Sequence, residues 1–167
     1  DQLYPNVGVS VVKILRKLGV TVGFPKDQTC CGQPVYNTGF SDEARSLAKR
    51  FLEQFRDSEY IVVPSGSCAA TIRVFYQELF AEDEELLLEA KAIGAKTYEF
   101  SEFLVNVLKV ENASDFGAMS EETIAYHPSC HLLRELGVRS EPQKLLDSVP
   151  GLAQKELKGA EICCGFG

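Results

Sequence analysis

The sequence has no long hydrophobic run and no excess of basic charge. Its longest clean apolar stretches are as short as Ile61-Val62-Val63, whereas a membrane-spanning helix needs about 18 or more apolar residues. Lys and Arg number 17 against 24 Asp and Glu, so the net charge is −7. An acidic chain is a poor partner for a phosphate backbone or an anionic membrane surface. We therefore expect no transmembrane segment and no nucleic-acid partner.

Several familiar motifs are also missing. The chain has no Cys-x-x-Cys knuckle of the kind that structural zinc sites usually carry. His127 stands where a haem-attachment motif ending in Cys130-His131 would need a cysteine. Ser65-Gly66-Ser67 lacks the lysine of a phosphate-binding loop, so we interpret it as the turn that aims Cys68. There is no signal peptide and no initiator Met, so the start of the chain is expected to be processed or truncated.

Size and composition are those of an ordinary globular protein. The chain has 167 residues, of which 45% are apolar and 25% charged. A chain of this length buries about 70% of its unfolded surface, so it needs neither disulfides nor a metal merely to fold.

Six cysteines are the unusual part of the composition. Four of them form two adjacent pairs, each followed by glycine, and the full set is Cys30, Cys31, Cys68, Cys130, Cys163 and Cys164. A disulfide scaffold is disfavoured, because vicinal cysteines bond each other only with backbone strain and nothing marks the chain as secreted. In a reducing cytoplasm, clustered cysteines indicate metal, iron–sulfur or redox chemistry. Inert buried thiols are the alternative for a single cysteine. We expect a cytoplasmic protein.

Short apolar segments alternate with amphipathic ones along the chain. The pattern predicts strands at 21–24, 60–64 and 123–126, helices at 7–18, 41–55, 69–80, 84–93, 102–110 and 140–149, and loops at 30–39 and 113–120. Ser41, Ser101 and Ser140 are the expected helix caps, the last in a capping box with Gln143. The alternation predicts an α/β fold with short parallel sheets and flanking helices. Such sheets place ligands at the carboxyl ends of their strands, where Cys68 and Cys130 are expected.

An internal repeat is visible as well. A helix, a glycine stop, a short strand and a Cys-Cys-Gly loop occur twice, with Gly19 11 residues before Cys30 and Gly151 12 residues before Cys163. We predict two pseudo-symmetric repeats, 1–110 and 120–167, packed as one globular unit, the second incomplete at its C-terminus.

The repeat also makes a claim about cysteines outside the chain. By its spacing, further cysteines are expected within about five residues upstream of Asp1 and about 30 to 40 residues beyond Gly167. The sequence is then a fragment cut inside a two-fold repeat at both ends. Each site would hold only three of its thiolates here. Three cysteines can still keep a cluster with one open iron, but we expect the structure to show empty thiols, a stray metal or an oxidised pair.

The spacing of the cysteines suits a polynuclear centre. A cysteine after a strand, a pair about 33 residues on and another cysteine about 37 residues later can supply four thiolates from three loops. Adjacent thiolates diverge, so they bind different irons of a cluster more readily than one ion. Thiolate-only sets favour iron–sulfur or zinc over magnesium or calcium, and the glycines let backbone amides approach the sulfurs.

Two histidines flank Cys130. His127 and His131 are candidates for a ligand or proton-transfer role, with hydrogen bonding to a thiolate favoured for His131. The alternative is that His127 only ends a strand and His131 is a polar cap.

The combination of motifs resembles a known family. The matching segments are Cys30-Cys31-Gly32-Gln33-Pro34-Val35-Tyr36-Asn37-Thr38-Gly39, Pro64-Ser65-Gly66-Ser67-Cys68, His127-Pro128-Ser129-Cys130-His131 and Cys163-Cys164-Gly165-Phe166-Gly167. Over its whole length the chain resembles the cysteine-rich CCG domain family of iron–sulfur proteins. That family includes the B subunit of heterodisulfide reductase and the iron–sulfur subunit of glycolate oxidase, and this chain is most similar to the lactate-utilization protein A family.

The resemblance implies a function and a ligand set. It implies a non-catalytic electron-transfer subunit, with an iron–sulfur cluster of the 4Fe–4S type, in a complex with other iron–sulfur and flavin proteins. That complex would oxidise L-lactate, or a related 2-hydroxy acid such as glycolate, to the 2-oxo acid. By the resemblance, Cys30, Cys31 and Cys68 match ligands of the first repeat, and Cys130, Cys163 and Cys164 match those of the second.

One departure from the family pattern bears on the chemistry. The heterodisulfide reductase pattern often ends a repeat in Cys-x-x-Cys, and Thr71 stands here where the second cysteine would be. The departure argues against thiol–disulfide catalysis. The alternative function is a zinc- or thiol-based binding module with no redox role. The iron and zinc contents of the purified protein would distinguish this module from an electron-transfer subunit.

Overall fold

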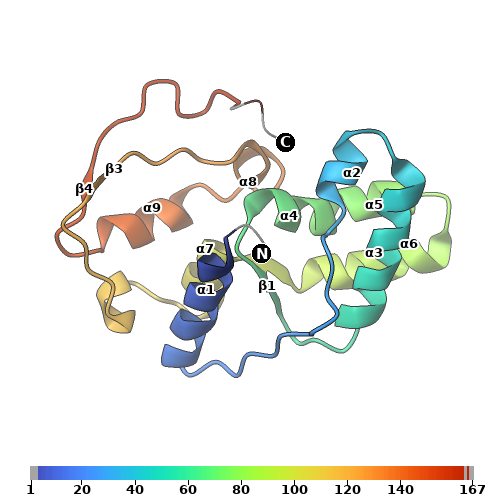
Figure 1. The fold of residues 1–167 in the computed structure, drawn as a ribbon, viewed down its shortest axis with the longest axis horizontal. Helices are drawn as coiled ribbons and strands as arrows, with labels where there is room; N and C mark the ends of the chain where they lie inside the picture. The colour runs from blue at the N-terminus through green and yellow to red at the C-terminus, as the bar shows by residue number, and fades with distance from the viewer. Residues whose placement is uncertain (1–3, 164, 166–167) are drawn as a thin grey trace.

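Two small parallel sheets form the β-structure of the described residues (Figure 1). The computed structural model describes residues 4–163 and residue 165. Strand β1 (Ile61–Val63) pairs with β2 (Thr97–Glu99), and β3 (Thr123–Ile124) pairs with β4 (Ala153–Gln154), both in parallel. The expected α/β class with short parallel sheets is confirmed.

Helices make up most of the remaining regular structure. In chain order they are α1 (Pro5–Lys17), α2 (Gln33–Asn37), α3 (Ser41–Phe55), α4 (Gly66–Ala70), the π-helical η1 (Thr71–Phe75), α5 (Tyr76–Leu79), α6 (Glu84–Ala95), α7 (Phe100–Glu102), the π-helical η2 (Phe103–Val107), the 3₁₀ turn η3 (Ala113–Phe116), α8 (Cys130–Arg134) and α9 (Ser140–Asp147).

The two sheets are built by similar connections. The chain runs from β1 to β2 through α4, η1, α5 and α6, and from β3 to β4 through α8 and α9. In each case the first strand leads into a short helix that carries a cysteine, Cys68 on α4 and Cys130 on α8. These two helices pack against each other at the centre of the molecule (Figure 1). The arrangement supports two pseudo-symmetric halves.

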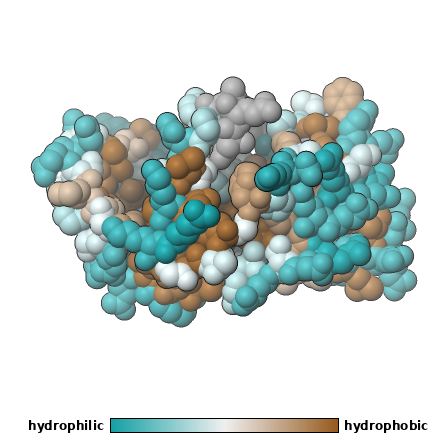
Figure 2. All heavy atoms as spheres, turned by 60° about the horizontal axis from the view of Figure 1, so that its bottom comes forward, coloured by the Kyte–Doolittle hydropathy of each residue, from teal (hydrophilic) through white to brown (hydrophobic). Residues whose placement is uncertain are grey.

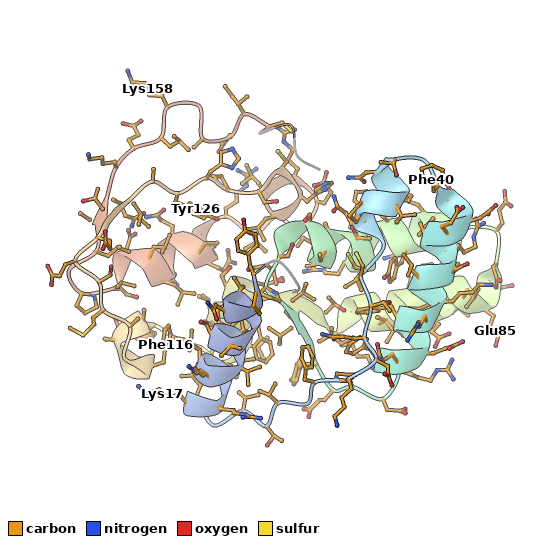
Figure 3. All side chains as sticks on the ribbon, viewed as in Figure 1. Lys17, Phe40, Glu85, Phe116, Tyr126 and Lys158 are labelled. Carbon is orange, nitrogen blue, oxygen red and sulfur yellow. The ribbon has the colours of Figure 1, made fainter. Side chains whose placement is uncertain are left out.

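Two apolar clusters stabilise the fold. The first joins α3, α5 and α6, and Cys31 and Cys68 lie at its edge. The second joins α1 to η2 and includes Leu15, Phe103 and Leu104. Figure 3 shows Lys17 and Phe116 on neighbouring segments, where the end of α1 approaches η3. Figure 2 shows apolar side chains gathered on one face over the region of α1, with hydrophilic side chains around them.

One predicted strand is wrong. Residues 21–24 form no regular structure, and no strand among the described residues pairs with them. Val20 and Val22 pack instead against the second apolar cluster. Gly19 and Gly151 share a left-handed backbone, with φ of 82° and 81°, but only the segment after Gly151 goes on to form a strand. The two repeats therefore share the glycine turn, but only the second has the strand after it.

The three predicted serine caps are also wrong. Ser41 and Ser140 are the first residues of α3 and α9, and no side chain caps either helix. Ser101 is buried inside α7, and the cap of that helix is Glu99, in a capping box with Glu102. Helix ends depend on a few local hydrogen bonds, which a residue-type pattern fixes only to within one or two positions.

Other differences lie within segments that were expected to be uniform. The predicted loop at 30–39 contains α2, and the loop at 113–120 contains η3. The predicted helices at 69–80 and 102–110 each contain a π-helical segment. Strand β2 was not predicted. Among the described residues, no helix is both long and apolar enough to cross a membrane.

Candidate metal centre

The first Cys-Cys-Gly loop turns its two thiols in different directions. Cys31 is buried with 7% of its surface exposed, whereas Cys30 is exposed. Gly32 has a φ of 87°, and its amide donates a hydrogen bond to the sulfur of Cys30 at 3.4 Å. A left-handed backbone of this kind favours glycine, because a side chain would be strained there. The left-handed turn at Gly32 thus places the Gly32 amide next to the sulfur of Cys30.

The second Cys-Cys-Gly loop has the same turn. Gly165 has a φ of 79°, and its amide donates to the sulfur of Cys163 at 3.4 Å. The expected approach of backbone amides to sulfur is therefore present in both loops. Cys164 lies outside the described residues, so its predicted role as a ligand stays a prediction.

Cys68 meets the first loop from helix α4. Ser65 caps this helix, and its hydroxyl oxygen accepts a hydrogen bond from the Cys68 amide at 3.4 Å. The side chains of Cys68 and Cys31 hydrogen-bond each other. The structure therefore brings these two cysteines together from segments 37 positions apart in the sequence, and Ser65 does form the turn that aims Cys68.

The Cys31–Cys68 contact separates the acidities of the two thiols. The hydrogen bond from Cys31 is the main reason why the pKa of Cys68 falls to about 6. The same bond, followed by burial and by the charge of Cys68, raises the pKa of Cys31. The pair is thus arranged to carry one negative charge, with Cys68 as the thiolate and Cys31 as the donor. A thiolate is the form of cysteine that binds metals.

The second group of cysteines also comes together. Cys130, at the start of α8, hydrogen-bonds Cys163. The amide of Gly165, then Cys130, and then the charge of Arg134 lower the pKa of Cys163. His127 also contacts the segment that leads to Cys163. Its Nε2 donates a hydrogen bond to the carbonyl oxygen of Ile162 at 3.0 Å.

His131 has contacts of a different kind. Its Nδ1 lies 3.3 Å from Glu135 Oε2 without an aligned hydrogen bond, and its ring stands edge-on to Phe75 with centroids 5.5 Å apart. Phe75 in turn stacks on Tyr36 at 5.3 Å. This aromatic row connects α2, next to the first Cys-Cys-Gly loop, with α8, which carries Cys130. The predicted role of His131 beside a thiolate stays a prediction.

Thr71 occupies the position of the missing second cysteine. The side chain is buried, and its hydroxyl donates to the carbonyl oxygen of Ser67 at 2.8 Å. The hydroxyl is thus committed to the helix backbone, which agrees with a structural role for this residue.

Tyr76 is a site residue that the sequence did not reveal. It has no exposed surface, and its hydroxyl donates to the carbonyl oxygen of Cys31 at 2.8 Å. Burial is the main reason why its pKa is raised, so the hydroxyl stays protonated and remains a donor. On a regular α-helix a residue eight positions after Cys68 is rotated by about 80° from it, so helical spacing alone did not point to a contact with the cysteine loop.

The donor chemistry fits a soft metal centre. None of the five described cysteines forms a disulfide bond, and thiolates with amide hydrogen bonds to sulfur are typical of iron–sulfur sites. In the part of the chain that the structure describes, no three Cys, His, Asp or Glu side chains meet closely enough to hold a metal ion. Each described group is a pair of contacting thiols, with Cys30 near the first pair.

Comparisons with known proteins agree with the cysteine pattern. The family model of the CCG cysteine-rich domain matches residues 1–73 and 124–167. Lactate utilization protein A of Bacillus subtilis (strain 168) is 48% identical, and lactate utilization protein A 2 of Bacillus cereus (strain 03BB102) 46% identical. Both alignments span 167 residues, which is 100% of this chain and 68% of each relative. No solved structure gives a significant match. The chain belongs to the lactate utilization protein A family of cysteine-rich CCG-domain proteins.

Proposed function

We propose that this chain is an iron–sulfur electron-transfer subunit of a cytoplasmic complex that oxidises L-lactate, or a related 2-hydroxy acid such as glycolate, to the 2-oxo acid. Its partners would be the flavin and iron–sulfur proteins of that complex. The names of the relatives, which are lactate utilization proteins, support the pathway.

The observation that carries the redox part of the proposal is the shared geometry of the two Cys-Cys-Gly loops. In each loop a glycine amide lies 3.4 Å from the sulfur of the first cysteine. In each, a cysteine that follows a parallel strand contacts the loop, Cys68 in the first group and Cys130 in the second. Hydrogen bonds from amides to sulfur are a main means by which proteins tune iron–sulfur potentials.

Six cysteines would hold the cofactor. Cys30, Cys31 and Cys68 would contribute to one centre, and Cys130, Cys163 and Cys164 to the other. A bound cluster of the 4Fe–4S type would supply one-electron transfer. Cys31 belongs to the first apolar cluster and Cys68 packs against it, so apolar side chains would cover this side of the centre. Cys30 is exposed, so its side of the loop would be the one open to a partner protein.

The electrons and protons of the proposed reaction can be accounted for without a catalytic step on this chain. Oxidation of lactate to pyruvate releases two electrons and two protons, which a flavin partner can accept together. Electrons would then leave the flavin singly through this subunit, and the protons would go to solvent. No residue of this chain is assigned a catalytic role.

The proposal is tested by reduction with substrate. The chain, loaded anaerobically with iron and sulfide, is mixed with the flavin protein of its own complex, and L-lactate is added. We expect the visible absorption of the chain to bleach with lactate and with glycolate if both are substrates. An unchanged spectrum with every 2-hydroxy acid, in a complex that still reduces its own flavin, would overturn the proposal.

A zinc- or thiol-based binding module is the second candidate. The hydrogen-bonded pair of Cys31 and Cys68 favours it, because two thiols in contact can join a zinc site without any redox role. A colourless protein with stoichiometric zinc, unchanged by iron and sulfide, would support this candidate.

A further inference from the structure

Tyr76 is fully buried at the first group of cysteines and has no part in the function proposed above. Its hydroxyl hydrogen bond to the carbonyl oxygen of Cys31 joins residues 45 positions apart in the sequence. Its ring packs edge-on against Phe51 on α3, with centroids 5.8 Å apart. The tyrosine is therefore held by packing on one side and bound to the Cys-Cys-Gly loop on the other.

The π-helical segment explains how Tyr76 reaches this place. Cys68 and Tyr76 lie on one continuous helix, with η1 between them. A π-turn accommodates one residue more than an α-helical turn. Eight positions that include such an insertion then correspond to about seven positions of a regular helix, or roughly two turns. The insertion thus moves Tyr76 onto the face of Cys68, towards Cys31.

The peptide group between Cys31 and Gly32 has a partner at each end. A trans peptide is planar, so its C=O and N–H point in opposite directions, and the described residues contain no cis peptide. The carbonyl oxygen accepts from Tyr76 at 2.8 Å, and the amide donates to the sulfur of Cys30 at 3.4 Å. A rotation of this plane would weaken both hydrogen bonds together.

We propose that Tyr76 is a positioning residue of the first centre, whose hydroxyl fixes the Cys31–Gly32 peptide and so aims the Gly32 amide at the sulfur of Cys30. Its effect on a bound cluster rests on the proposed function. Its effect on the loop does not, because both hydrogen bonds are made by the chain alone.

The second loop provides an internal control. Val138 lies eight residues after Cys130, as Tyr76 lies eight after Cys68, although α8 has already ended at Arg134. Val138 is buried and has no hydroxyl to donate. The amide of Gly165 nevertheless makes the same contact with the sulfur of Cys163. A change at Tyr76 should therefore affect Gly32 and leave Gly165 unaffected.

The test uses Tyr76→Phe, which removes only the hydroxyl. The matched control is Tyr36→Phe, because the Tyr36 hydroxyl binds the exposed carboxylate of Glu78 at 2.7 Å and no part of the cysteine loop. Amide hydrogen exchange is followed by NMR in the reduced, metal-free chain. We expect Gly32 to exchange about tenfold faster in Tyr76→Phe, the loss expected for one buried hydrogen bond. Gly165 should not change, and Tyr36→Phe should match the wild type.

Two further measurements complete the test. After loading with iron and sulfide, Tyr76→Phe should shift one reduction potential downwards, because an amide hydrogen bond to sulfur favours the reduced, more negative cluster. In the wild-type chain, deuterium-isotope splitting of the Tyr76 Cζ signal should show a slowly exchanging hydroxyl, which requires no variant to fold.

The outcomes separate the two proposals. An unchanged Gly32 exchange rate in a folded Tyr76→Phe chain, or a rapidly exchanging Tyr76 hydroxyl in the wild type, would overturn the positioning role. Faster exchange at Gly32 in a chain that binds no iron would support that role while the proposed function fails.

Discussion

Gly66 lies directly against Leu132, and a Cβ placed on Gly66 would stand 2.6 Å from the Cβ of Leu132 and 3.2 Å from its Cα. Gly66 is the first residue of α4, and Leu132 is in the middle of α8. The two helices carry Cys68 and Cys130, so this contact sets the distance between the two cysteine groups. Only a residue without a side chain fits at Gly66.

We predict that Gly66→Ala destabilises the protein by about 1–3 kcal/mol, because the added methyl group overpacks a contact with backbone atoms. Urea unfolding of the reduced chain measures the change in the free energy of unfolding. Gly23→Ala is the control, since no atom lies within 4 Å of a Cβ at Gly23, and its effect should stay within about 0.5 kcal/mol. Equal stability of the two variants would show that α4 and α8 are not in close contact.

Arg73 in η1 forms a partly buried ion pair with Glu102 in α7. One guanidinium nitrogen lies 3.0 and 2.9 Å from the two carboxylate oxygens, and the Glu102 side chain is only 12% exposed. We predict that Glu102→Gln lowers the free energy of unfolding by about 1–3 kcal/mol, since it weakens a shielded hydrogen bond between charged groups.

The control for this ion pair is Asp42→Asn on the surface of α3. Asp42 also pairs with an arginine, Arg45, at 3.1 Å, but its side chain is 94% exposed. An exposed pair contributes about 0–1 kcal/mol. Urea unfolding should therefore rank the two variants clearly, and a larger loss from Asp42→Asn would contradict the structure.

Glu99 gives a prediction about pH. Burial raises its pKa above the usual 4.5, although Ser101 and the amides of residues 101 and 102 donate to the carboxylate and partly offset this. The favourable contribution of Glu99 is thus fully present below pH 4.5 and is lost as the pH rises through the folded-state pKa.

The variant Glu99→Gln removes this titration while keeping an acceptor oxygen for the capping hydrogen bonds. The difference in unfolding free energy between wild type and variant should therefore shift in favour of the variant as the pH increases from 4.5 towards neutral. Urea unfolding at several pH values measures it. A difference that is constant with pH, or that shifts in favour of the wild type, would contradict the raised pKa.

Much of the fold was predictable because its signals are local. The strand at 60–64 and the helix at 7–18 were found from short apolar runs and helical spacing, close to the observed β1 and α1. Residues 21–24 were expected to form a strand from the same kind of signal but form none. A strand requires a neighbour to bond with, and propensity does not supply one. The predictions of serine caps were wrong for a similar reason, because capping depends on the direction of the side chain and not only on the residue type.

Two contacts between cysteines were predictable, and the rest of the geometry around them was less so. The Cys-Cys-Gly motifs led to the contacts of Cys31 with Cys68 and of Cys130 with Cys163. Tyr76 was missed, because its position depends on the π-helical insertion at η1, which no residue type in Thr71–Phe75 announces. The aromatic row through Phe75 is hidden from sequence for the same reason.

The central claim is that the two cysteine groups hold iron–sulfur clusters. Its most direct test is the iron, acid-labile sulfide and zinc content of the chain after anaerobic reconstitution, compared with Cys68→Ser and Cys130→Ser. We predict iron and sulfide in equal amounts in the wild type, with about half lost in each variant, because each removes a ligand from one group only. A protein that takes up zinc but neither iron nor sulfide, or that keeps all its iron in both variants, would contradict the account.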